Sequence, residues 1–349
     1  MTPNQDELSH FRVVRLNSKI SPVDDFESSQ YKRYGIRPVL VEANTPQDII
    51  PQVAESDAIL VVSTALPGEV VESLSRCRII SRLGIGTDKI DVEMARRMGI
   101  LVTNVPGCFA EEVADHTMGF ILALARKFPQ MSRAMVEGAW SRSRRQAVQN
   151  HRLSSCTLGL IGFGDSASLV ARRAHVFGLR ILATRRHLGN QSQGAEDLGV
   201  KLVDLDTLLA ESDFVSLHLP LNQETYHLLD AAAIQKMKPG AFLINTARGA
   251  IVDEYALAQA LRDGRLDGAG LDTFEHIDPF SGVEIPPDHP LLHLENVILT
   301  PHVAALSAEG MREVSEKGIE NVATVLNGHW PRAERIVNSG VFPRFPLTA

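Results

Sequence analysis

Short apolar runs alternate with amphipathic stretches along most of the chain. In the first third, apolar runs predict strands at 37–41, 58–63, 78–81 and 101–103. The stretches between them predict helices at 46–55, 67–75 and 92–98. Because strands that alternate with helices form parallel sheets, this third predicts an α/β fold.

The same alternation resumes after a long helix, expected at 110–126, and a polar, irregular connector, expected at 137–155. Strands are then predicted at 158–161, 180–183, 201–203, 214–217, 241–245, 268–271 and 297–299. A last helix is expected at 308–326, where Gly328 and Pro331 end it. The chain therefore contains two α/β units, and the last helix could pack on either.

Composition excludes several classes of protein. A length of 349 residues fits two domains, and a net charge of −7 gives no basic surface for nucleic acid. The apolar runs are too short to cross a bilayer, and the first residues lack the features of a secretory signal. Three widely spaced cysteines favour a reducing compartment. We expect a cytoplasmic protein without membrane or nucleic-acid partners.

A glycine-rich turn joins a predicted strand to a predicted helix at Gly162-Phe163-Gly164-Asp165-Ser166-Ala167. In this GxGxxA pattern the first glycine permits a tight turn, and the second lets the backbone approach a pyrophosphate. The third position needs a small residue for helix packing, and the helix N-terminus favours the phosphate charge. The turn predicts dinucleotide binding, although Asp165 brings a negative charge close to the expected pyrophosphate.

The next strand predicts which dinucleotide binds. In NAD-binding proteins this strand is followed by a carboxylate that binds the ribose 2′-hydroxyl. Here the sequence is Thr184-Arg185-Arg186, whose hydroxyl and guanidinium groups suit a 2′-phosphate. The sequence therefore predicts NADP, with NAD as the less favoured cofactor.

Two residues that follow strands offer chemistry for a hydride transfer. Arg248 follows the strand at 241–245, and His302 follows the strand at 297–299. Arginine can bind a 2-oxo carboxylate and polarise its ketone, and histidine can exchange a proton near neutral pH. Each residue alone also fits a structural role. His289 and His293 are separated by Pro290 and lack a third ligand, so no metal site is predicted.

Several motifs, in order, resemble those of the D-isomer-specific 2-hydroxyacid dehydrogenases. This family includes glyoxylate/hydroxypyruvate reductases, phosphoglycerate dehydrogenases and the C-terminal-binding-protein corepressors. The resemblance spans about 58–338, and the matching segments are LGIGTDKID at 83–91, VTNVPG at 102–107, VADHT at 113–117, SDFVSLHLP at 212–220, MKPGAFLINTAR at 237–248, GAGLD at 268–272 and TPH at 300–302.

The resemblance implies a role for each matching residue. Arg248 would bind the substrate carboxylate and ketone, His302 would be the acid/base, and Asp272 would lie at the nicotinamide carboxamide. The remaining cofactor contacts would be Leu219, Pro220, Thr225, Thr246 and Ala247. The substrate contacts in the N-terminal part would be Ile85, Gly86 and Asn104.

The resemblance also implies an architecture. The fold would be two doubly wound parallel-sheet domains with a cleft between them. Residues 116–304 would form a Rossmann-type dinucleotide-binding domain. Residues 1–115 and 305–349 would form a flavodoxin-like substrate-binding domain. The helix at 110–126 would mediate a homodimer.

Three positions depart from the family pattern: Asp165 replaces arginine, Arg185 replaces an acid, and Ile277 replaces the glutamate that orients the histidine. The segment that follows is also longer than usual. Glu284 is our preferred replacement for the missing glutamate, and Asp278 is the alternative. If neither carboxylate pairs with His302, the pKa of this histidine is lowered and activity shifts to more acidic pH.

The leading functional hypothesis is an NADP-preferring oxidoreductase. It would transfer a hydride between nicotinamide C4 and C2 of a small 2-oxo acid or D-2-hydroxy acid. The alternative is a cofactor-sensing, corepressor-like binding protein of the same fold. A third possibility is an enzyme of this fold with another hydride donor, such as formate or phosphite.

Overall fold

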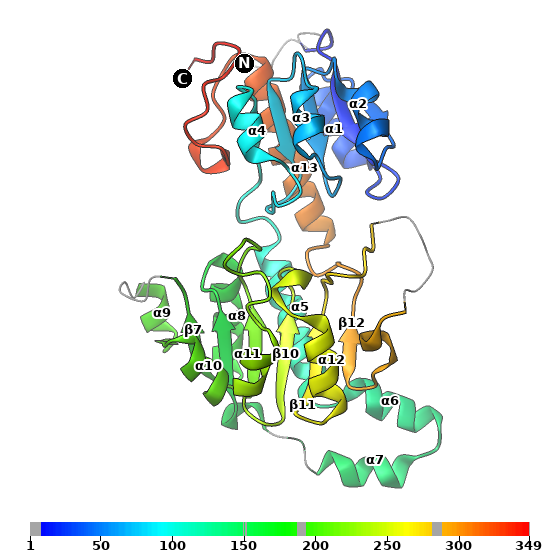
Figure 1. The fold of residues 1–349 in the computed structure, drawn as a ribbon, viewed down its shortest axis with the longest axis vertical. Helices are drawn as coiled ribbons and strands as arrows, with labels where there is room; N and C mark the ends of the chain where they lie inside the picture. The colour runs from blue at the N-terminus through cyan, green and yellow to red at the C-terminus, as the bar shows by residue number, and fades with distance from the viewer. Residues whose placement is uncertain (1–7, 149, 151, 187–192, 281–287, 349) are drawn as a thin grey trace. The chain divides into compact units, whose positions relative to one another are not determined.

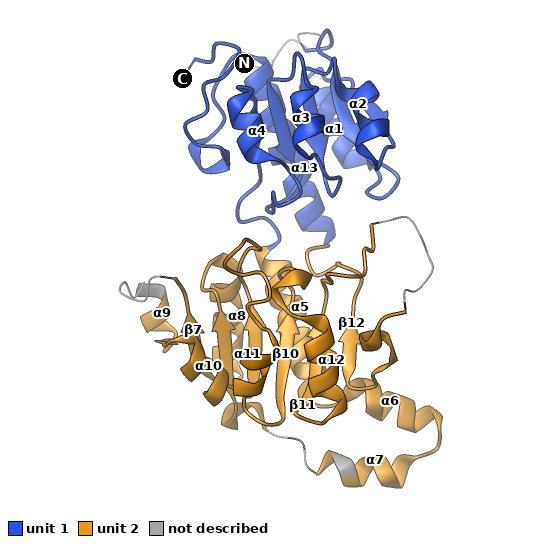
Figure 2. Cartoon of the chain, in the orientation of Figure 1, with its two compact units in different colours: residues 1–109, 307–349 blue, residues 110–306 orange. Residues whose placement is uncertain are grey.

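The computed structural model describes residues 8–148, 150, 152–186, 193–280 and 288–348, and the chain folds into two compact units. Unit 1 contains residues 1–109 and 307–349, and unit 2 contains residues 110–306 (Figures 1 and 2). The boundaries predicted from the sequence lie instead between residues 115 and 116 and between residues 304 and 305. Helix α5 (Ala110–Ala125) is continuous and packs on the second sheet, so all of it belongs to unit 2.

Unit 1 is built on a five-stranded parallel sheet with the order β2-β1-β3-β4-β5. This is the flavodoxin-like doubly wound order. Helices α1 and α13 cover one face, and α2, α3 and α4 cover the other. The elements are β1 (Val13–Leu16), α1 (Asp25–Arg33), β2 (Val39–Val41), α2 (Pro46–Val53), β3 (Ala58–Val61), α3 (Gly68–Glu72), β4 (Ile79–Arg82), α4 (Val92–Arg97), β5 (Leu101–Thr103) and α13 (Ala308–Leu326).

Strand β1 and helix α1 were not predicted from the sequence, because each contains a buried charged residue of one hydrogen-bonded network. Arg15 lies in the middle of β1 with a fully buried side chain, and its Nε donates a 2.9 Å hydrogen bond to Glu27 Oε1. Glu27, on α1, also accepts from the Tyr31 hydroxyl at 2.8 Å. A buried arginine interrupts the apolar pattern that identifies a strand, and a buried glutamate does the same for the helix.

Unit 2 is built on a seven-stranded parallel sheet with the order β12-β11-β10-β9-β6-β7-β8. The strand order reverses between β6 and β9, where open α/β sheets bind ligands beyond the carboxyl ends of their strands. The strands are β6 (Thr157–Ile161), β7 (Arg180–Thr184), β8 (Lys201–Leu202), β9 (Phe214–Leu217), β10 (Ala241–Asn245), β11 (Leu266–Leu271) and β12 (Val297–Leu299).

Helices cover both faces of this sheet (Figure 1). Helices α5 and α8 (Asp165–Val176) pack on one face. Helices α10 (Leu205–Glu211), α11 (Ala231–Lys236) and α12 (Glu254–Arg262) pack on the other. Helix α9 (Gln193–Asp197) lies next to β8 in sequence. The predicted fold class, two doubly wound parallel-sheet domains, is confirmed.

The connector after α5 is more helical than predicted. It contains α6 (Phe128–Val136) and α7 (Trp140–Ala147), so the expectation of an irregular 137–155 segment was wrong. Helix α6 buries none of its residues, and large apolar side chains such as Val136 and Trp140 are exposed. Helix α7 is short and consists mostly of polar and charged residues, so its sequence resembles that of an irregular connector. Within the described residues, no helix has the length and apolarity that a membrane span requires.

Candidate active site in the dinucleotide-binding unit

The glycine-rich turn has the geometry that its sequence predicts. Gly162 follows β6 with a φ of +91°, and a Cβ there would lie 2.4 Å from the carbonyl oxygen of His218. Only glycine fits that position. Ala167, the small residue of the pattern, is fully buried in the core beneath α8. The turn therefore fits a dinucleotide.

In the part of the chain that the structure describes, no side chain caps the backbone amides at the N-terminus of α8. Gly164 is the N-cap residue, and the first helical hydrogen bond runs from Ser168 N to Gly164 O at 2.9 Å. The amides of the first turn precede that bond and are natural donors to an anion. Asp165 has an exposed side chain, and Phe163 packs partly against the core.

The end of β7 brings an arginine to this turn. Thr184 O accepts a 2.9 Å hydrogen bond from Gly162 N, which joins the strand to the glycine turn. The next side chain, Arg185, has a buried Nε and Nη2 with no hydrogen-bond partner in the part of the chain that the structure describes. Arg186 differs because it is exposed and forms an ion pair with Glu224. Arg185 is therefore the guanidinium left available to bind an anion.

The loop after β9 lies on the other side of the switch point. It contains Leu219 and Pro220, and Thr225 closes it, donating to Pro220 O at 2.8 Å. Leu219 packs partly against the core. The loop follows the strand that neighbours β6, so the predicted cofactor contacts of both segments lie at one edge of the sheet.

The turn that carries Arg248 is fixed by the buried residue at the end of β10. Asn245 Nδ2 donates to Arg248 O at 2.9 Å, and its Oδ1 accepts from Ala247 N at 3.0 Å. The Thr246 hydroxyl lies 3.1 Å from that of Thr117 on α5. Sequence reasoning missed Asn245 as the residue that shapes this turn, although the Asn-Thr-Ala-Arg motif contains it.

Asp272 organises the turn that carries His302. Its buried carboxylate accepts from Thr300 Oγ1 at 2.5 Å, Val303 N at 2.8 Å and Ala304 N at 2.9 Å. His302 has a φ of +57°, a left-handed conformation that is uncommon for a residue with a side chain. The predicted contact of Asp272 with the nicotinamide stays a prediction.

Two further residues contact the turn that carries His302, and neither contact was predicted from the sequence. His116 Nε2 lies 3.0 Å from Thr300 Oγ1, so α5 is joined to the same turn. The ring of Phe280 packs edge-on against the ring of His302, with 5.2 Å between their centroids. The sequence could not reveal this contact of His116, because only the fold brings its ring to Thr300.

A buried glutamate supports the segment between Asp272 and Phe280. Glu254, the first residue of α12, accepts from Glu275 N at 2.8 Å and lies 3.3 Å from His289 Nε2. Burial raises the pKa of Glu254. Gly249 directly follows Arg248, and a Cβ on Gly249 would lie 1.9 Å from the carbonyl carbon of Phe274. The turn that carries Arg248 therefore packs directly on the segment between Asp272 and Phe280.

The carboxylate partner of His302 is not assigned by these contacts. Glu284, the preferred partner, lies outside the described residues. Asp278, the alternative, is exposed, and its Oδ1 accepts from Phe280 N at 2.9 Å. Asp278 thus shapes the turn that presents Phe280. Within the described ranges, no three His, Cys, Asp or Glu side chains are grouped to hold a metal.

Two predicted substrate residues of unit 1, Ile85 and Gly86, lie in the loop after β4, and the third, Asn104, follows β5 and donates to that loop. Three carbonyl groups of the loop accept hydrogen bonds. Gly84 O accepts from Val105 N at 2.9 Å, Ile85 O from Asn104 Nδ2 at 2.8 Å, and Gly86 O from Arg82 Nε at 2.9 Å. In a trans peptide group the N–H points in the opposite direction to the C=O. The N–H groups of Ile85, Gly86 and Thr87 therefore point away from the groups that donate to these three carbonyls. Consecutive amides of this kind can bind an anion.

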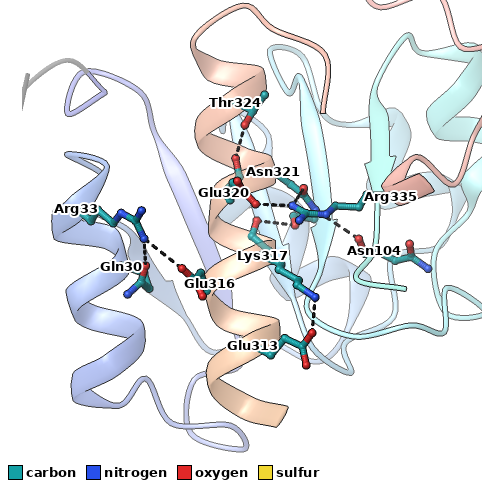
Figure 3. Close-up of polar contacts among 12 residues, drawn as sticks. Gln30, Arg33, Asn104, Glu313, Glu316, Lys317, Glu320, Asn321, Thr324 and Arg335 are labelled. Atoms are coloured by element: carbon teal, nitrogen blue, oxygen red, sulfur yellow. Dashed lines mark hydrogen bonds and ion pairs between the residues drawn. The ribbon is translucent and has the colours of Figure 1, made fainter. Parts of the chain in front are cut away.

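Asn104 is itself fixed by the C-terminal part of the chain (Figure 3). Its backbone N donates to Arg335 O at 3.0 Å, and its carbonyl accepts from Asn321 Nδ2 at 3.4 Å. Arg335 in turn binds Glu320 Oε2 at 2.6 Å and Asn321 Oδ1 at 3.0 Å. The last helix, α13, therefore positions a predicted substrate residue of unit 1.

Comparisons with known proteins agree with this arrangement. Residues 118–304 match the family described as D-isomer specific 2-hydroxyacid dehydrogenase, NAD binding domain. The chain is 41% identical over 288 residues to a glyoxylate reductase of Korarchaeum cryptofilum, covering 81% of this chain and 83% of the relative. It is 41% identical over 286 residues to a hydroxypyruvate reductase of Thermotoga maritima, covering 81% and 88%.

A solved structure agrees as well. The D-lactate dehydrogenase of Aquifex aeolicus, complexed with NAD and lactic acid, superposes with a TM-score of 0.84 at 27% identity, covering 94% of this chain and 99% of that one. These comparisons do not favour the cofactor-sensing alternative. The chain is an enzyme that uses a nicotinamide cofactor, and it belongs to the D-isomer-specific 2-hydroxyacid dehydrogenase family.

Proposed function

We propose that this enzyme prefers NADP(H) and reduces a small 2-oxo acid to the D-2-hydroxy acid. The observation that carries the reaction is the position of Arg248 and His302, which follow β10 and β12 of the sheet that bears the phosphate turn. Ketone reduction needs a cation for the substrate and a proton donor, and these residues supply both.

Arg248, His302 and Glu284 have different tasks in this reaction. When bound, the nicotinamide supplies the hydride that C2 of the substrate receives. Arg248 binds the carboxylate and polarises the ketone. His302 donates its proton to the ketone oxygen, which becomes the hydroxyl of the product. Glu284 is the proposed partner that stabilises the protonated imidazole.

Arg185 supports the preference for NADP. A guanidinium with buried nitrogens and no hydrogen-bond partner among the described residues is costly unless a ligand pairs with it. A ribose 2′-phosphate supplies the oxygens that it lacks. Thr184 lies beside it, whereas Arg186 is already paired with Glu224. We therefore assign the 2′-phosphate to Arg185.

The remaining predicted residues complete the proposed site. The amides of Ile85 and Gly86, with Asn104, would bind the substrate carboxylate. The cofactor would be lined by Gly162, Phe163, Gly164, Asp165, Ser166, Leu219, Pro220, Thr225, Thr246, Ala247 and Asp272. Glyoxylate and hydroxypyruvate, the substrates in the names of the two relatives, are the first candidates.

A homodimer in the cytoplasm completes the proposal. The sequence assigned the interface to the helix at 110–126, and the connector that follows it supports an extension. Phe128, Met135, Val136 and Trp140 are between 57% and 88% exposed. Exposed apolar side chains of this size are typical of interfaces. Sedimentation at the mass of a monomer would reject the dimer.

The test is initial rates of glyoxylate and hydroxypyruvate reduction with NADPH and NADH at equal concentration. Wild type should prefer NADPH, and Arg185→Asp should lose that preference because the carboxylate repels a 2′-phosphate. Arg186→Asp is the matched control and should keep most of it. A wild type that prefers NADH would reject the assignment of NADP. Absence of turnover with either cofactor would reject the proposed reaction.

A further inference from the structure

A short hydrogen-bonded chain runs from the middle of the second sheet to the phosphate turn. Ser216 is a fully buried residue of β9, and its Oγ lies 2.9 Å from His218 Nε2. On the other side of the same ring, His218 Nδ1 lies 3.4 Å from Ser166 Oγ. Ser166 is the second residue of α8, in the turn whose amides face the expected pyrophosphate.

The imidazole of His218 is fixed in place by its backbone as well as by its ring. The carbonyl oxygen of His218 is the atom that a Cβ on Gly162 would approach to 2.4 Å. The backbone N of His218 donates to Ile161 O at 2.8 Å. The backbone of His218 is thus anchored to the end of β6 and lies against the first glycine of the turn.

Among the described residues, the ring has two polar contacts, and both are hydroxyl groups. Burial lowers the pKa of His218 to about 4, which leaves the imidazole neutral at physiological pH. A neutral imidazole donates from one nitrogen and accepts at the other. If Ser216 donates to Nε2, Nδ1 carries the proton and donates to Ser166 Oγ. The hydroxyl proton of Ser166 is then directed away from the ring.

We propose that His218 is a positioning residue for the cofactor, which orients the Ser166 hydroxyl so that it donates to the pyrophosphate. This inference rests on the proposed binding of a dinucleotide by the glycine-rich turn. It also gives a physical reason why this turn tolerates Asp165. The turn has no cationic side chain next to its second glycine, and an oriented hydroxyl is a neutral donor that adds to the helix amides.

The test uses the full-length protein and the dissociation constants of two ligands. NADPH spans the phosphate turn, whereas adenosine 2′-monophosphate lacks the pyrophosphate and serves as the control ligand. Ser166→Ala and His218→Leu should each weaken NADPH binding by about tenfold, the typical effect of one hydrogen bond to a charged group. Ser216→Ala should weaken it by about threefold because it removes the group that fixes the tautomer. Adenosine 2′-monophosphate should bind all variants within about twofold of wild type.

Two further variants separate positioning from a merely structural role. His218→Asn keeps a donor near the place of Nδ1, so it should restore most of the NADPH affinity that His218→Leu loses. The double variant Ser166→Ala/Ser216→Ala should bind NADPH no more weakly than Ser166→Ala alone, since both act through one hydroxyl.

The outcomes are distinct. The inference is overturned if Ser216→Ala and His218→Leu bind NADPH as wild type does, or if they weaken both ligands equally. A wild type that binds neither NADPH nor NADH would instead overturn the proposed function. Because Ser216→Ala is a small change, it keeps the test valid even if His218→Leu fails to fold.

Discussion

The buried carboxylate of Asp272 holds the backbone on both sides of His302. It accepts from Thr300 Oγ1 before the histidine and from the amides of Val303 and Ala304 after it. Three hydrogen bonds to one carboxylate maintain a left-handed φ of +57° at His302, a conformation that costs about 1 kcal/mol or more for a residue with a side chain. The direction of the proposed proton donor is therefore set by a residue that follows the neighbouring strand, β11.

This relationship predicts the effect of Asp272→Asn. The N–H groups of Val303 and Ala304 donate to different carboxylate oxygens, and asparagine replaces one of these oxygens by an NH2 group that cannot accept. The turn therefore loosens and the imidazole loses its orientation. We expect kcat to fall by about tenfold or more and the free energy of unfolding to fall by about 1–3 kcal/mol. Steady-state kinetics and denaturant unfolding would measure both. Thr300→Val removes one of the three bonds and should give a smaller loss, and an unchanged kcat in Asp272→Asn would contradict the positioning role.

Two glycines of the phosphate turn should respond differently to alanine. Gly162→Ala places a Cβ 2.4 Å from a backbone carbonyl at a φ of +91°, so we expect a loss of about 2–4 kcal/mol in the free energy of unfolding. Gly164→Ala meets no atom within 4 Å and has a φ of −107°. It should leave stability nearly unchanged but weaken NADPH binding, because the methyl group blocks the approach of a pyrophosphate. Equal stability losses in the two variants would reject this distinction.

Much of the fold could be predicted from the sequence because most strands are apolar and buried. Strands β9, β10 and β12 and helix α13 occur at the residues predicted for them. The elements that were missed, β1, α1, α6 and α7, either bury charged groups or pack on no core. Of the candidate site, the sequence contained the glycine turn, Arg248 and His302. It could not reveal His116, Glu254 or His218, because their roles depend on contacts between segments far apart in the chain.

The buried ion pair between Arg15 of β1 and Glu27 of α1 leads to a prediction on stability. Removing one partner of a buried pair leaves an uncompensated charge in the core, so Arg15→Met should lower the free energy of unfolding by about 3–5 kcal/mol. The double variant Arg15→Met/Glu27→Leu removes both charges and should recover most of that loss. Arg33→Met, which breaks an exposed pair with Glu316, is the control and should cost less than about 1 kcal/mol. A double variant no more stable than Arg15→Met would show that the loss does not come from the uncompensated charge of Glu27.

The histidine beneath the phosphate turn makes stability depend on pH. Burial lowers the pKa of His218 from 6.5 to about 4, so below pH 6.5 the unfolded chain binds a proton that the folded protein excludes. The stabilisation is fully present above pH 6.5 and is lost as the pH falls towards 4. Over that range the contribution amounts to about 3 kcal/mol, by the conversion of 1.36 kcal/mol for each pKa unit.

This dependence is measurable by urea unfolding at a series of pH values. His218→Asn has no titrating ring, so its free energy of unfolding should fall less than that of wild type between pH 6.5 and 4. His293→Asn, at a ring that is 71% exposed, is the matched control and should follow wild type. Parallel curves for wild type and His218→Asn would mean that folding does not lower the pKa of His218.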